Sequence, residues 1–120
     1  MKEQINQWFE QSAPFEGILA CGLRFPDQSS ISKSWADGFE ESSIENALRC
    51  VSDGFQVAQF NRIVPTRLRW VYSGAFLYCE RRQDGSLLGV FTSKSLESLD
   101  LDGLERFFGE FQTVARAATL

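Results

Sequence analysis

The chain has no histidine among its 120 residues, and it has only three cysteines. Without histidine, the Ser-His-Asp and Cys-His nucleophile systems are excluded, and so are zinc sites that contain histidine. Cys21, Cys50 and Cys79 form no C-x-x-C pair, so no structural metal is expected. All three lie among apolar neighbours, which predicts inert, buried thiols in a reducing cytoplasm.

Long apolar runs, glycine-rich phosphate loops and a basic charge balance are also missing. No apolar run approaches the ~18 residues of a membrane span, and the N-terminus lacks the pattern of a signal peptide. No phosphate-binding loop motif occurs, so we expect no cofactor. The net charge of −4 and the isoelectric point near 4.8 argue against a nucleic-acid partner, because phosphates require a basic face.

Catalysis by carboxylates alone stays open, because Asp and Glu are plentiful. Solvated carboxylates are far commoner than catalytic ones, however, and we expect no enzymatic activity. The sequence is rich in apolar residues: they make up 43% of the chain and include eleven Phe and three Trp. This composition is typical of a compact globular protein, and the length predicts one domain over residues 1–120.

The segment from Ser42 to about Arg62 predicts a helix that is apolar over about half of its circumference. Its core face recurs at intervals of three and four residues: Ile44, Leu48, Val51, Phe55 and Ala58. A second flank, defined as Ala47, Cys50, Gly54 and Val57, widens the apolar arc to about 180°. One core-facing helix needs only about 100°, so we expect this helix to pack on its own sheet and on a further surface. Ser42 with Glu45 fits a capping box at its start.

The remaining elements follow from hydrophobic periodicity and turn residues. We expect helices over 2–12 and from a cap at Asp100 or Ser98 to Ala118, and strands over 17–25, 31–36, 67–73, 75–82 and 87–92. The apolar strand 17–25 is predicted to be central, and 31–36 to be an edge. This order predicts an α/β (α+β) fold, with a five-stranded antiparallel sheet and helices on both faces.

The element order and two segments resemble the roadblock/LC7 family, the dynein light chain roadblock-like domains. In LRWVYSGAFLYCERRQDGSLLGVFTSKSLESLDLDGLERFFGEF, two hairpins lead through an apolar strand into the closing helix. The start FEGILACGLRF looks like the glycine-led first strand of that family. The turn from Pro26 to Ser30 departs from the usual Asp-Gly-type turn, which leaves the register of the first two strands open.

The resemblance implies a profilin-like fold, a homodimer and a non-catalytic adaptor role, including binding or regulation of a small Ras-like GTPase or another protein partner. Family members pair their third strands edge to edge and lay their middle helices side by side. Carried onto this chain, the implied dimer interface is Ala47, Cys50, Gly54, Val57, Arg67, Arg69 and Val71. Strand 67–73 is also apolar enough on one face to be hazardous as a bare edge.

Two alternatives stay open beside the adaptor role. A secretion chaperone is also small, acidic, dimeric and α/β, although that class usually has three strands before its middle helix. A sensor domain would hold a small ligand between sheet and helix. Trp35, in the expected edge strand, is a candidate contact for a partner or a cover for the sheet.

Overall fold

The computed structural model describes residues 2–115, and it confirms the predicted element order. The elements are α1 (Lys2–Gln11), β1 (Ile18–Arg24), β2 (Ser30–Ser34), α2 (Glu41–Phe60), β3 (Leu68–Val71), β4 (Phe76–Arg81), β5 (Leu87–Thr92), the short 3-10 helix η1 (Leu96–Ser98) and α3 (Leu101–Thr113). The sheet has the order β2-β1-β5-β4-β3, and every neighbouring pair is antiparallel. The five-stranded antiparallel sheet was predicted from the sequence and is confirmed.

The positions of the strands agree with their hydrophobicity. β1 lies between β2 and β5, as a strand that is buried on both sides requires. β2 and β3 are the two edges of the sheet. The register left open by the sequence is now fixed, with Gly22 opposite Ser32 across β1 and β2. The intervening turn places Gln28 at a φ of 74°, in the left-handed region.

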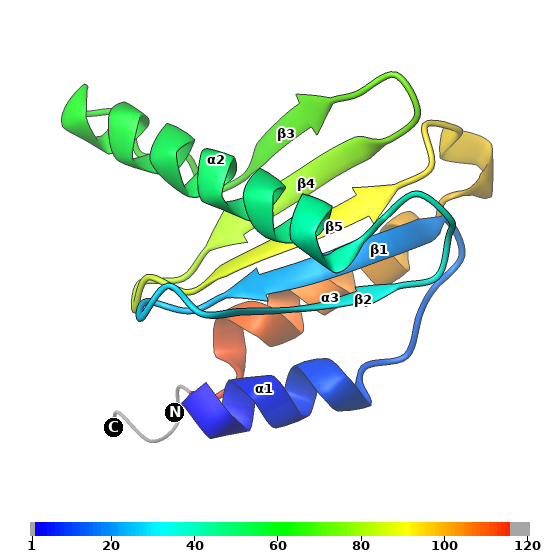
Figure 1. Ribbon diagram of the computed structural model, residues 1–120, viewed down its shortest axis with the longest axis horizontal. Coiled ribbons are helices and arrows are strands. Elements are labelled where there is room, and N and C mark those ends of the chain that lie inside the picture. The colour runs from blue at the N-terminus through cyan, green and yellow to red at the C-terminus, as the bar shows by residue number, and fades with distance from the viewer. Residues whose placement is uncertain (1, 116–120) are drawn as a thin grey trace.

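Helices cover both faces of the sheet, with α2 on one side and α1 and α3 on the other (Figure 1). α2 packs its predicted core face onto the sheet, and Ile44, Leu48, Val51 and Phe55 are all buried. It lies close to the central strands because these carry glycines at the contact. A Cβ on Gly22 would lie 2.6 Å from Cγ2 of Ile44, and one on Gly89 would lie 2.6 Å from Cδ2 of Leu48. The opposite layer is rich in Phe, with Phe9, Phe107, Phe108 and Phe111 in one cluster.

The ends of several elements differ from the prediction. α2 starts after Glu40, which makes no side-chain capping bond, so the predicted capping box of Ser42 and Glu45 is wrong: Ser42 already lies inside the first turn. α2 and β3 are also shorter than the sequence predicted. α2 stops at Phe60, before Arg62 at a φ of 62°, and β3 is shorter than the expected 67–73.

The start of the last helix is as predicted. Asp100 is its cap, and its carboxylate accepts a hydrogen bond of 2.9 Å from the backbone N–H of Gly103. α3 ends at Thr113, and Ala118, which was expected to belong to it, lies outside the described residues. Across residues 2–115, no helix combines the length and the apolar character that crossing a membrane requires.

Candidate protein-interaction site

The second flank of α2 lies on the part of the helix that its own sheet does not cover. Val57 is 62% exposed and Cys50 is exposed, while Ala47 and Gly54 are half-buried. The prediction that Cys50 is buried is therefore wrong. Cys50 lies next to the core residue Val51 in sequence, and a step of about 100° around the helix turns it away from the sheet.

The other two cysteines are buried as predicted. Cys21 and Cys79 lie in the sheet, on β1 and β4. Burial raises the pKa of the Cys21 thiol to about 12, and it raises the pKa of Cys79 as well. Both groups are therefore protonated and unreactive near neutral pH, whereas Cys50 is open to solvent on the second flank.

Gly54 contacts a side chain of its own chain. A Cβ on Gly54 would lie 3.3 Å from Cζ2 of Trp70 and 3.4 Å from its Cη2. Trp70 belongs to β3, and it packs against the cluster beneath α2. The space beside Gly54 is thus partly filled by β3, and the small residue lets α2 and β3 pack closely within one copy.

β3 is one edge of the sheet, and among the described residues only β4 pairs with it. Its side chains alternate between the two faces, as in any strand. Leu68 and Trp70 pack under α2, so Arg69 and Val71 project on the face that carries α3. The seven predicted interface residues therefore form two groups on opposite faces, joined by the backbone edge of β3.

Arg67 is committed to contacts within the chain. Its Nε donates to Glu80 at 2.8 Å, and its two terminal nitrogens donate to the two carboxylate oxygens of Glu105 on α3 at 2.5 and 3.0 Å. The guanidinium lies 4.5 Å from the ring centre of Phe108. Hydrogen bonding from Arg67 lowers the pKa of Glu105, and the same bonds raise the pKa of Arg67. Arg67 thus fastens the start of β3 to α3.

Arg69 and Val71 are open to solvent. The guanidinium carbon of Arg69 lies 4.7 Å from the ring centre of Phe76 on β4, and Val71 is 61% exposed. An exposed branched side chain beside an unpaired strand edge is a feature that folded proteins usually avoid. This part of the predicted interface is therefore accessible in one copy.

Sequence reasoning missed an apolar group at the end of α2. Phe60 is 89% exposed and Val64 is 82% exposed, and Ile63 between them is exposed too. They continue the apolar surface of Val57 beyond the last buried position of the helix. The signal was present in the sequence, since Phe60 lies off the core face of the predicted helix, and Ile63 and Val64 follow its end without a strand or helix pattern that would bury them.

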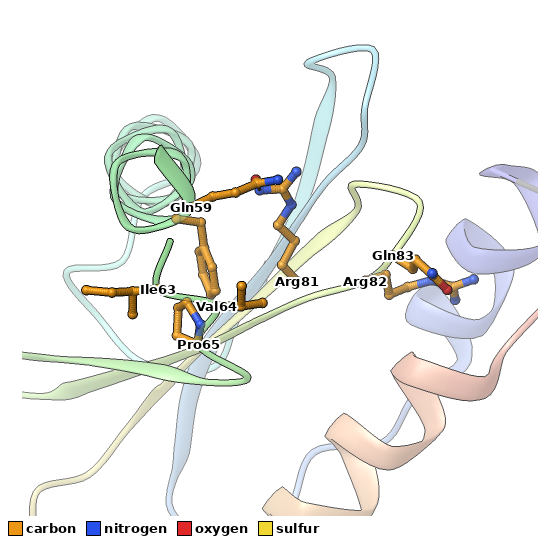
Figure 2. Close-up of a pocket in the computed structure, with 8 residues that line it drawn as sticks. Gln59, Ile63, Val64, Pro65, Arg81, Arg82 and Gln83 are labelled. Carbon is orange, nitrogen blue, oxygen red and sulfur yellow. Dashed lines mark hydrogen bonds between the residues drawn. The ribbon is translucent and has the colours of Figure 1, made fainter. Parts of the chain in front are cut away.

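Ile63 and Val64 of this group also line a hollow of about 280 Å³, and Figure 2 shows residues that line it. One wall of the hollow is formed by Ile63, Val64 and Pro65. Arg81 points toward Gln59 of α2, and its guanidinium donates a hydrogen bond of 3.4 Å to the side-chain oxygen of Gln59. Arg82 leaves the sheet in the other direction (Figure 2). Its guanidinium donates to the carbonyl oxygens of Phe111 at 2.8 Å and Val114 at 2.6 Å, and so caps the end of α3.

A second cavity, of about 430 Å³, lies between the start of α2 and the β3–β4 turn. We call it the Phe91 cavity, and its lining residues are Asp37, Gly38, Phe39, Ser43, Ile44, Ala47, Tyr72, Gly74, Ala75 and Phe91. Trp35, the candidate partner contact, lies just after β2 and is 42% exposed; its backbone N–H donates to the carbonyl of Leu19 at 2.9 Å. The described part of the chain holds no cluster of acidic, histidine or cysteine side chains that fits a metal ion.

Comparison with known proteins identifies a similar fold but no sequence family. Neither a protein-family profile nor a curated protein sequence matches this chain. Among solved structures, Myxococcus xanthus MglB is similar, with a TM-score of 0.54, 13% sequence identity, and coverage of 91% of this chain and 89% of that chain. At this identity the likeness shows the fold alone, and it supports a roadblock-like fold for the chain.

Proposed function

We propose that this chain is a non-catalytic cytoplasmic adaptor of one domain, which pairs with a second copy through the second flank of α2 and the free edge of β3. The observation that carries the proposal is the uncovered apolar strip along α2, from Cys50 through Val57 to Phe60, beside an unpaired strand edge. Contiguous exposed apolar surface of this kind marks interaction sites.

Pairing with a second copy satisfies both features at once. Two β3 edges related by a two-fold axis run antiparallel, so each supplies the backbone donors and acceptors that the other needs. β3 has only four residues, so its ladder is short. The apolar second flank would then contribute most of the buried surface, because burying apolar area is the main favourable term in association.

We further propose that the paired platform binds or regulates a small Ras-like GTPase. The support is the roadblock/LC7 resemblance together with the roadblock-like fold. Recognition would depend on surface complementarity, with apolar anchors such as Phe60 beside exposed charges.

The GTPase proposal is tested by capture on the immobilised chain. A native extract would be divided and loaded with GDP or with a non-hydrolysable GTP analogue, and the retained proteins identified by mass spectrometry. We expect a Ras-like GTPase whose recovery depends on the nucleotide and falls with the Val57→Glu variant. Recovery of no GTPase in either nucleotide state would contradict this part of the proposal and leave the pairing untouched.

The two alternative functions, a secretion chaperone and a small-ligand sensor, differ in the observations that support them. β1 and β2 are the only strands before α2 among the described residues, whereas a secretion chaperone usually has three there. Co-purification with an unfolded effector segment would nevertheless favour that class. A ligand-sensor role has one specific observation in its favour, the Phe91 cavity, and native mass spectrometry of the purified chain would detect a retained small molecule.

A further inference from the structure

The Phe91 cavity is built from aromatic and aliphatic side chains of three separate segments. Phe91 of β5 is almost fully buried and forms the floor. Phe39, before α2, lies with its ring centre 5.1 Å from that of Phe91, and Tyr72, after β3, lies 6.3 Å from it. The volume of about 430 Å³ falls within the range of roughly 300–1,000 Å³ that is usual for ligand pockets. The cavity is thus large enough for a bulky apolar group.

The segment that leads from the cavity lining into α2 is acidic. Asp37 is the one acidic side chain among its lining residues, and Glu40 and Glu41, both exposed, lie between the lining residues Phe39 and Ser43 in the chain. The sequence has no Lys or Arg between Lys33 and Arg49. The start of α2 contributes a positive partial charge of only about half a unit, which three carboxylates outweigh. The lining and this segment together therefore carry net negative charge, which favours a cationic group beside the cavity.

From these two observations we propose that the Phe91 cavity receives a bulky apolar side chain of a protein partner, presented by a segment in which Lys or Arg flank that side chain. Aromatic walls around a buried floor are typical of the sites where a few anchor residues provide most of the binding energy. The acidic segment would select the basic flanks and speed their association. The site lies within one copy, so the inference goes beyond the proposed pairing and does not depend on it.

The test uses short fluorescent peptides and anisotropy titrations at low ionic strength. The probe carries one Phe between two pairs of lysines. Two matched peptides replace the Phe with Ala or all lysines with Glu. We expect the probe to bind at least tenfold more tightly than either matched peptide. Equal binding of the Phe and Ala peptides would show attraction by charge alone and would overturn the proposal.

Variants of the chain assign the binding to the cavity. Tyr72→Ala removes one wall, and Ser43→Trp fills the space from an exposed helix position without emptying the core. Each substitution is expected to lower the affinity for the probe at least fivefold. Asp37→Lys should lower the affinity for the probe as well, whereas Glu3→Lys, the matched charge reversal on α1, should leave that affinity unchanged. If Tyr72→Ala fails to fold, Ser43→Trp alone tests the site. An unchanged affinity of Ser43→Trp for the probe would contradict the proposal.

A final comparison separates this inference from the pairing. Ala47 belongs both to the second flank and to the lining of the cavity, whereas Val57 belongs to the second flank alone. We expect the Val57→Glu variant to bind the probe as the unchanged chain does, whether or not it pairs. Tighter binding by that variant would show that a second copy occupies the cavity, and it would overturn the proposal while supporting the pairing.

Discussion

Gly54 of α2 faces the indole ring of Trp70 on β3, and a Cβ there would lie 3.3 Å from the ring. Gly54→Leu must therefore displace the indole, at a cost of roughly 1–3 kcal/mol for overpacking. The better helix propensity of Leu offsets about 0.8 kcal/mol of this cost. We expect a net loss in the free energy of unfolding, measured by urea denaturation.

The control for that variant is Gly109→Ala on α3, where an added Cβ meets no other atom within 4 Å. It should stabilise the chain by up to about 1 kcal/mol, because Ala is the better helix former. A Gly54→Leu variant at least as stable as the unchanged chain would show that Trp70 does not limit this position. For the same reason, Gly54→Leu cannot serve alone as a probe of pairing.

Arg67 joins β3 to Glu80 on β4 and to Glu105 on α3. Arg67→Ala should lower the free energy of unfolding by about 1–2 kcal/mol, mainly because the largely buried Glu80 loses its ion pair. The more exposed Glu105 contributes less, since solvent screens it. Lys2→Ala, which removes the exposed pair with Asp27, is the matched control and should unfold close to the unchanged chain. Equal effects of the two substitutions would argue against a special role for Arg67.

The Glu105 pair also makes stability depend on pH. The folded-state pKa of Glu105 is lowered, first by the hydrogen bond from Arg67, whereas in an unfolded chain a Glu titrates near about 4.3. The pairing therefore stabilises the fold above that value, and the contribution is lost as pH falls through the lower folded pKa. Urea midpoints of the unchanged chain and Glu105→Gln should differ at neutral pH and converge as pH falls through the lowered folded pKa of Glu105. A difference that persists or grows in acid would contradict this assignment.

Cys50 should be the reactive thiol of the folded, unpaired chain. Cys21 and Cys79 are buried, with raised pKa values, and Cys50 is exposed on α2. Brief treatment of the Val57→Glu variant, in which the proposed pairing does not cover Cys50, with iodoacetamide at neutral pH is expected to add one label by intact mass measurement, and an added Cys50→Ser should remove it. In denaturant all three should react. A label on Cys21 under native conditions would show that the sheet opens more readily than the structure indicates.

Local patterns were enough to predict the element order. The apolar repeat that starts at Ile44 gave the core face of α2, and the cap at Asp100 gave the start of α3. Both are set by neighbours in sequence, through side-chain periodicity and a hydrogen bond across one helical turn. The central position of β1 followed from its continuous apolar run.

The site was less predictable, because it depends on contacts between distant segments. The approach of Trp70 to Gly54 joins two elements, and the turn of Arg67 toward Glu105 joins two more. The sequence marked Arg67 as basic and gave no sign that α3 would engage it. The burial of Cys50 was misjudged because apolar neighbours in sequence do not fix which side of a wide helix faces the sheet. The Phe91 cavity likewise joins three segments that no local pattern relates.

Sedimentation velocity over a series of concentrations tests the pairing through α2 and β3 most directly. At micromolar concentration the unchanged chain should sediment with about twice its 13.6 kDa mass. Val57→Glu, which places a charge on the second flank, should shift it toward the single-chain mass, whereas Leu101→Glu, at an exposed apolar position on α3, should not. An unchanged chain that sediments at 13.6 kDa throughout, or a Val57→Glu variant that pairs as before, would contradict the proposed interface.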